Sequence, residues 1–201
     1  MQFATLTLAA LSIGSVLASP TTIGLSEPKV LTSAIGAVSN SKSAVDTQLV
    51  IIQNLVQTTV NDAAIPALRA SLNNIAAEIT SVTNFVVPLV TNVALPLAQQ
   101  ELDNLPGFVT NVKGIAGDVQ YTANFILANL SQQTLLFVKT EVLLVLATIN
   151  PFVQPVIQFA SSAIVGTSGP STNTIAVTIA TTQDIASQIQ GPITAAFNKL
   201  V

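Results

Sequence analysis

Apolar residues in this chain recur with the period of an α-helix, and this pattern constrains the fold more than any other feature. Between Pro28 and about Asp62 the apolar positions lie alternately four and three residues apart, which places their side chains on one face of a helix. Lys42 occupies the one place in the series that is not apolar. A long amphipathic helix is therefore predicted, with a break near Asn40 as the alternative because Gly36 weakens its interior. The series is Leu31, Ile35, Val38, Val45, Leu49, Ile52 and Val56.

Four further stripes with the same spacing follow, so the chain reads as helical almost throughout. They cover residues 68–93, 105–130, 131–152 and 175–200, and residues 166–171 form the clearest loop. Prolines cut the pattern into segments too short for a fibrous rod, and no repeat of fixed length is present. We therefore expect an all-α fold, an antiparallel bundle of about five amphipathic helices with several kinked by proline. It would form a single domain over residues 28–201.

Residues 1–18 have the pattern of a secretory signal peptide. An apolar run from Phe3 to Ala18 ends in small residues before Ser19-Pro20, although no Lys or Arg precedes it. The run is short for a bilayer span. We expect cleavage after Ala18, a short N-terminal extension at residues 19–27, and a secreted protein of the extracellular space or cell wall.

Composition excludes several classes of function. The chain has no Cys and no His, which rules out disulfides, thiolate or imidazole metal sites and His-assisted nucleophiles. Its 6 Lys and Arg are too few and too scattered for a nucleic-acid surface. Glu101 and Asp103 lie two residues apart and point to different sides of a helix, so they make a poor acid–base pair. We expect no enzyme activity, no cofactor, no metal and no nucleic-acid partner.

Three segments, residues 85–90, 93–98 and 142–147, are apolar on more than one helix face. A helix that is apolar all round is central, embedded in a membrane or covered by something else. A five-helix bundle has room for one central helix. The remaining apolar surface predicts either an internal apolar cavity or an apolar patch on the exterior.

Residues 142–165 are long enough to cross a bilayer, and no charge occurs in the 42 residues between Glu141 and Asp184. Four polar residues nevertheless recur at every fourth position of this segment, and their side chains would need partners in lipid. An amphipathic helix within a bundle fits this polar stripe better than a membrane span. The four are Asn150, Gln154, Gln158 and Ser162.

Large apolar side chains in the stripes are the candidate lining of a ligand cavity, although Phe at helical spacing is more often typical of a plain core. The single tyrosine, Tyr121, could hydrogen-bond a ligand head group, and the single arginine, Arg69, could hold a carboxylate. Asn129 begins the one sequon for N-glycosylation. The candidate lining residues are Phe85, Val86, Leu89, Phe108, Val112, Tyr121, Phe125, Phe137, Val145, Phe152 and Phe159.

The chain resembles the fungal hydrophobic-surface-binding and cell-wall galactomannoprotein family. The resemblance covers roughly residues 28–200 and is carried by the signal-like segment ending at Ala18 and by helices rich in Ala, Leu, Val, Ser and Thr. It includes the stretches Ser-Ala-Val-Asp-Thr-Gln-Leu at 43–49 and Leu-Asn-Asn-Ile-Ala-Ala at 72–77. It implies a secreted helical bundle without catalysis that binds lipids or adsorbs to hydrophobic surfaces, with a long-chain fatty acid between the helices in lipid-binding members.

Three hypotheses follow from these patterns. The leading one is a secreted, non-enzymatic protein that binds a long-chain fatty acid or other lipid in an apolar cavity between its helices. The alternative is a structural protein that coats the cell wall or adsorbs to hydrophobic solids, which requires an exposed apolar patch. The third is a membrane-active protein that uses the uncharged stretch 142–183.

Overall fold

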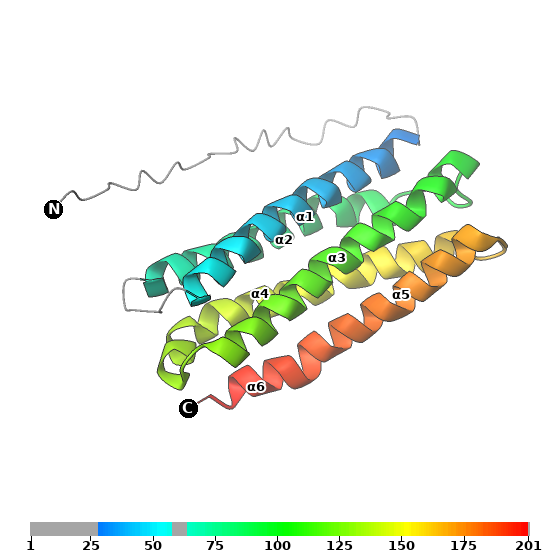
Figure 1. Cartoon of the computed structure of the whole chain (residues 1–201). Helices are drawn as coiled ribbons and strands as arrows, with labels where there is room; N and C mark the ends of the chain where they lie inside the picture. The colour runs from blue at the N-terminus through cyan, green and yellow to red at the C-terminus, as the bar shows by residue number, and fades with distance from the viewer. Residues whose placement is uncertain (1–27, 58–63, 201) are drawn as a thin grey trace.

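Five long helices make up most of the computed structural model, which describes residues 28–57 and 64–200 (Figure 1). The predicted signal peptide and the N-terminal extension lie outside the described residues. The prediction of an all-α bundle of about five helices is confirmed, and the described part of the chain contains no strand. The helices are α1 (Pro28–Gln57), α2 (Ala64–Thr91), α3 (Gln99–Asn129), α4 (Gln132–Ala163) and α5 (Pro170–Gln188), followed by a π-helical turn η1 (Ile189–Ile193) and the short α6 (Thr194–Asn198).

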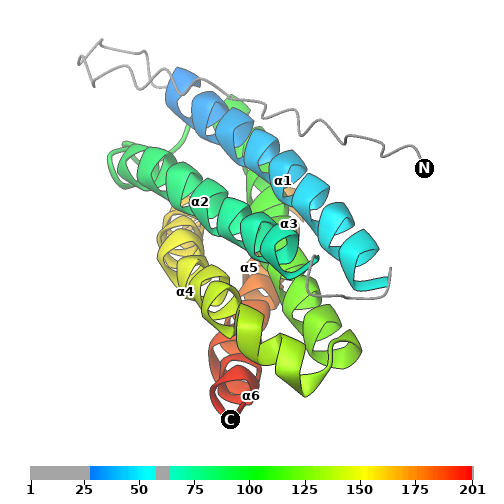
Figure 2. The ribbon, with the colours of Figure 1, turned by 90° about the vertical axis from the view of Figure 1, so that its left-hand side faces the viewer.

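Four of the long helices form a ring, and the fifth lies along one side of it. α1 and α4 each pack against both α2 and α3, and α5 packs against α3 and α4. Successive long helices run in opposite directions (Figure 1), and Figure 2 shows α1 and α2 as the layer farthest from α6. α1 therefore has two long helices as neighbours, whereas α4 has three.

α4 is the most thoroughly covered helix, which accounts for its apolar sequence. Among the described residues it is the one helix long and apolar enough to cross a membrane, and half of its most apolar window is buried within the bundle. The polar residues predicted to form a stripe on it are partly or fully exposed at the surface. The helix thus combines a wide buried face with one narrow face in water. The stripe residues are Asn150, Gln154, Gln158 and Ser162.

Different local features mark the helix starts: proline begins α1 and α5, and a side-chain cap precedes α4. The Oγ of Ser131 accepts a hydrogen bond from the Thr134 backbone N–H at 3.2 Å, so α4 begins where the sequence predicts. α3 begins at Gln99, well before Pro106, and Glu101 in its first turn favours the earlier start by interacting with the helix dipole. α1 runs through Asn40 without a break. The predicted proline kinks stay a prediction.

Lys42 fits the apolar stripe of α1 because its aliphatic stem packs on a glycine of α3. A Cβ atom built on Gly114 would lie 2.6 Å from Cε of Lys42, which is closer than carbon atoms approach. Gly117, one turn further along the same helix, has nothing within 4 Å of the same position. Gly114 therefore makes room for Lys42 in the seam between α1 and α3.

These two glycines provide a matched test of the packing. Gly117→Ala should raise the free energy of unfolding by about 0.5–1 kcal/mol, because alanine loses less conformational entropy in a helix. Gly114→Ala should raise the free energy of unfolding clearly less, because the new methyl group displaces Lys42. Urea denaturation of both variants measures the difference, and equal stabilisation would contradict the Lys42–Gly114 contact.

Candidate functional site

The predicted cavity-lining residues do not surround a common cavity. Val86, Phe108, Val112 and Phe152 are all 0% exposed. A side chain without accessible surface borders no space that a water molecule can enter, so no open cavity reaches these four side chains in this structure, and their role as the lining of a ligand cavity stays a prediction. Neighbouring helices fill the space around them, as is usual in close-packed protein interiors. Val145 and Phe159 are also buried in this core.

Other predicted lining residues lie at the surface of different helices. Phe85 on α2, Tyr121 on α3 and Phe137 on α4 are each about half exposed. Tyr121 stacks on Phe125 of its own helix, with ring centroids 5.9 Å apart, and Phe125 and Leu89 are partly buried. Part of the apolar excess in the sequence therefore lies on the exterior.

A groove of about 950 Å³ lies between α1 and α2. These two helices form the layer farthest from α6 (Figure 2). α1 contributes Ala37, Asn40 and Ser41 to its lining, and α2 contributes residues between Ala76 and Phe85. Phe85 is the one predicted lining residue among those that border it. Its volume lies within the range of about 300–1,000 Å³ that is typical of small-molecule sites.

Small side chains form most of the groove wall, and this is why the sequence pattern did not reveal it. Ala37, Ser41, Ala76, Ala77 and Ser81 do not reach across the seam between the helices. Large apolar residues at helical spacing indicate a buried helix face, whereas small residues such as Ala and Ser give no comparable pattern. The repeated Ala and Ser on both helices could have indicated a helix–helix contact with little side-chain volume in it.

One carboxylate lies in this groove. The Ser41 hydroxyl of α1 donates a hydrogen bond to Oε1 of Glu78 on α2, at 2.6 Å. Ser41 is buried, whereas Glu78 is half-buried. A charge-assisted hydrogen bond of this kind is stronger than one between neutral groups. It holds the carboxylate in place at the groove wall.

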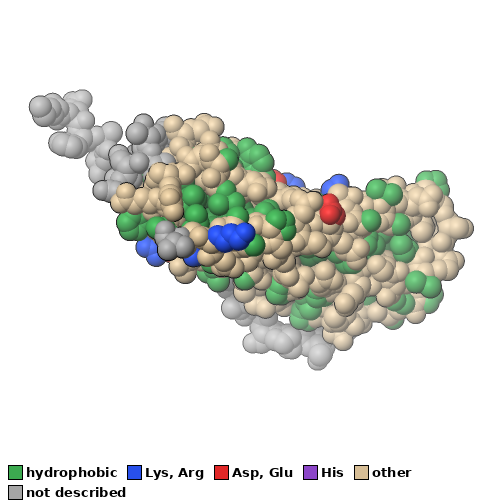
Figure 3. Space-filling view, turned by 90° about the horizontal axis from the view of Figure 1, so that it is seen from below, with side chains coloured by type: hydrophobic (Ala, Val, Ile, Leu, Met, Phe, Trp, Pro, Cys, Tyr) green, Lys and Arg blue, Asp and Glu red, His purple; other side chains and the backbone are tan. Residues whose placement is uncertain are grey.

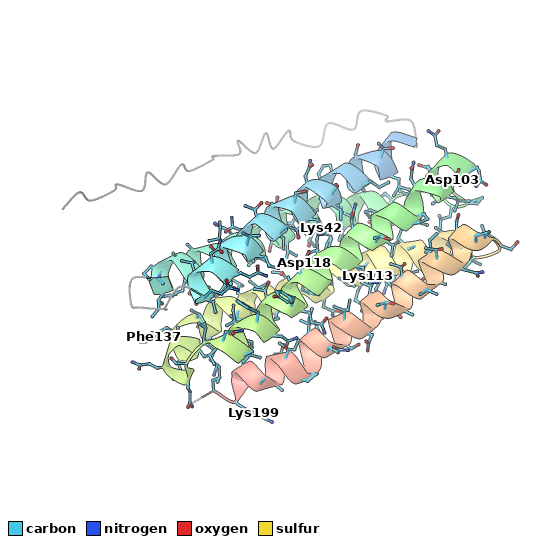
Figure 4. The ribbon with its side chains drawn as sticks, in the orientation of Figure 1. Lys42, Asp103, Lys113, Asp118, Phe137 and Lys199 are labelled. Carbon is cyan, nitrogen blue, oxygen red and sulfur yellow. The ribbon has the colours of Figure 1, made fainter. Side chains whose placement is uncertain are left out.

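A second polar cluster joins α1 to α3 (Figure 4). The Lys42 ammonium contacts both oxygens of Asp46, at 3.0 and 2.8 Å, and lies 3.3 Å from Oδ2 of Asp118. The hydrogen bond with Asp46 raises the pKa of Lys42. Burial, together with the neighbouring Asp46, raises the pKa of Asp118 to about 6. The cluster therefore holds two carboxylates and one ammonium between two helices.

Arg69, which the sequence offered as a ligand for an external carboxylate, pairs with a carboxylate of the protein itself. Its Nε and Nη2 both lie 2.6 Å from Oε1 of Glu141 on α4. Glu141 is buried, and its Oε2 has no hydrogen-bond partner. Arg69 thus neutralises a buried charge at the α2–α4 contact, which makes it a structural residue.

The comparisons with known proteins gave no match to a family model, a curated protein or a solved structure. Within residues 28–57 and 64–200, no group of three acidic side chains is placed to hold a metal ion. Asn129 is exposed at the end of α3, and its side-chain amide donates to the Phe125 carbonyl at 2.8 Å. Glycosylation at Asn129 stays a prediction.

The raised pKa of Asp118 predicts a pH dependence of stability. Its carboxyl has a pKa of about 6 in the folded protein against 3.8 when exposed, so the folded state binds the proton more tightly. The free energy of unfolding should therefore fall as the pH rises from about 4 to about 6, by an amount on the order of 1 kcal/mol after solvent screening.

Asp118→Asn should remove this pH dependence of the free energy of unfolding. Asp103→Asn, which alters an exposed acid on the same helix, should retain it. Urea denaturation at a series of pH values compares the three proteins. An unchanged slope in Asp118→Asn would contradict the assignment.

Proposed function

We propose that the protein is a secreted, non-enzymatic lipid-binding protein that holds a hydrocarbon chain in the groove between α1 and α2. The groove itself carries this proposal: its volume of about 950 Å³ is enough for a small amphiphile, and its wall is mainly apolar. The signal-like N-terminus and the absence of His and Cys from the sequence support a secreted protein without catalysis. The site lies in an open groove, in place of the closed cavity expected from the sequence.

Burial of alkyl groups would drive the binding. Each CH₂ group removed from water contributes about 0.8 kcal/mol when burial is complete. The groove is open along one side, so a bound chain keeps part of its surface in water and gains less per group. Phe85 is half exposed at one end of the lining and offers an aromatic face to the chain.

Filling the groove should block binding. Ala77 is exposed in the groove wall, and Ala77→Phe should raise the Kd of a dodecyl glycoside at least about tenfold, which corresponds to 1.4 kcal/mol. This probe is uncharged, so its binding reports on the apolar groove alone. Ala180→Phe, on the exposed face of α5, is the matched control and should leave the Kd unchanged.

Isothermal titration calorimetry below the micellar concentration of the glycoside measures both variants. Binding to the unaltered protein that is absent or weaker than about 1 mM would contradict the proposal. Equal binding by Ala77→Phe and the unaltered protein would place the ligand elsewhere.

Adsorption to hydrophobic surfaces or to the cell wall is a second candidate function, supported by apolar side chains on α4. Phe137 is 52% exposed and Leu144 is 50% exposed, and their seven-residue spacing places both on one face of the helix. Phe137 lies near the start of α4 (Figure 4), and Figure 3, a view from below, shows hydrophobic side chains in groups among other side chains and backbone. These side chains would adhere to an apolar solid without enclosing a ligand.

Two phenylalanines with almost the same exposure separate the two functions. Phe85→Ser should weaken binding of the dodecyl glycoside, because Phe85 lines the groove, and Phe137→Ser should not. Phe137→Ser should instead reduce adsorption to polystyrene beads if the second function holds. Adsorption that is unaffected by Phe137→Ser would argue against a role for this face of α4.

A further inference from the structure

The groove between α1 and α2 continues into a second, smaller hollow of about 370 Å³. The two hollows share Ala77, Glu78 and Ser81 of α2. The larger one borders α1 from Ala37 to Ser41 and the smaller one borders Ala44 and Gln48. Together they follow eleven residue steps along each helix, or about 16 Å at the α-helical rise.

The two hollows differ in polarity, and Glu78 lies where they meet. The end near Phe85 is bordered by Ala37 and Val82, together with Asn84. The smaller hollow is bordered by the amide side chains of Gln48 and Asn74. An elongated amphiphile fits this arrangement, with its alkyl chain toward Phe85 and its head group at Glu78.

The carboxylate of Glu78 has an oxygen that can accept a further hydrogen bond. Ser41 donates to Oε1, and among the described residues no donor contacts Oε2. Because Ser41 is buried, its hydroxyl holds the Glu78 carboxylate from the side of the protein interior. The open oxygen is therefore held in position for a donor in the groove.

Among the side chains that the structure describes, no basic one pairs with Glu78. Neither hollow is bordered by Lys or Arg. The basic side chains described on α1 and α2 have other partners: Lys42 pairs with Asp46 and Asp118, and Arg69 pairs with Glu141. A fatty carboxylate in the groove would place a second negative charge beside Glu78, whereas an ammonium group would form an ion pair with it.

We propose that the groove selects single-chain amphiphiles with a protonated amine head group and disfavours fatty carboxylates. The ammonium group donates to Oε2 of Glu78, and the amides of Gln48 and Asn74 accept its remaining hydrogens. This inference rests on the proposed function, because it assigns the head group of the ligand whose chain the groove holds.

Two probes with the same alkyl chain test the selection. Dodecylammonium and dodecanoate are titrated into the intact protein at pH 7, below their micellar concentrations, with calorimetric detection. Dodecylammonium should bind at least about tenfold more tightly than dodecanoate. Glu78→Gln should abolish this preference, and it preserves an acceptor for the Ser41 hydroxyl, so the variant should keep its thermal stability.

Asp184→Asn is the matched control, because it removes one negative charge from an exposed position on α5. General attraction of a cation to an acidic protein would fall equally in the two variants, and that result would overturn the proposed selection. Equal affinity of the two probes for the unaltered protein would also overturn it. Groove binding itself would still stand if Ala77→Phe blocks the uncharged glycoside, and it would fall if the glycoside failed to bind the unaltered protein or bound Ala77→Phe equally well.

Discussion

Burial of α4 is the constraint on which the rest of this structure depends. This helix is apolar on most of its circumference, and packing within the bundle removes much of that surface from water. α2, α3 and α5 cover it, which leaves α1 at the periphery with α2 and α3 as its long neighbours. The α1–α2 seam is thus free to carry small side chains, and the groove lies there.

The few charged side chains concentrate at the contacts between helices. Lys42 links α1 to α3, the Ser41–Glu78 hydrogen bond links α1 to α2, and Arg69 links α2 to Glu141 of α4. Half-buried pairs of this kind add little net stability, since desolvation offsets much of the attraction. The positions of these contacts define the axial register between the neighbouring helices. Glu78 is the member that borders the groove, which no described Lys or Arg lines, and this gives the groove its electrostatic character.

The fold was predictable because apolar spacing reports directly on helix formation. Leu31, Val38, Val45 and Ile52 all lie in the core, as the stripe on α1 predicts. The site was not predictable from the same pattern. Phe108 and Phe137 each directly precede a buried valine of a stripe, Val109 and Val138, yet Phe108 is fully buried and Phe137 is half exposed, because burial depends on which neighbouring helix covers each face. The groove arises from alanine and serine on two helices that are distant in the sequence, and its depth depends on their packing. The sequence contains more apolar side chains than one face of each helix requires. Some of these side chains lie on the surface, and neighbouring side chains fill the core around Phe152.

The account's central claim is that an alkyl chain binds between α1 and α2 and leaves the core intact. Nuclear Overhauser effects between a dodecyl chain and the methyl and aromatic protons of the protein test this directly. The account predicts contacts with Ala37, Ala77 and Phe85, all of which border the groove. Contacts with Phe108 and Phe152, which the groove does not reach, would show that the helices separate to admit the ligand and would contradict the account.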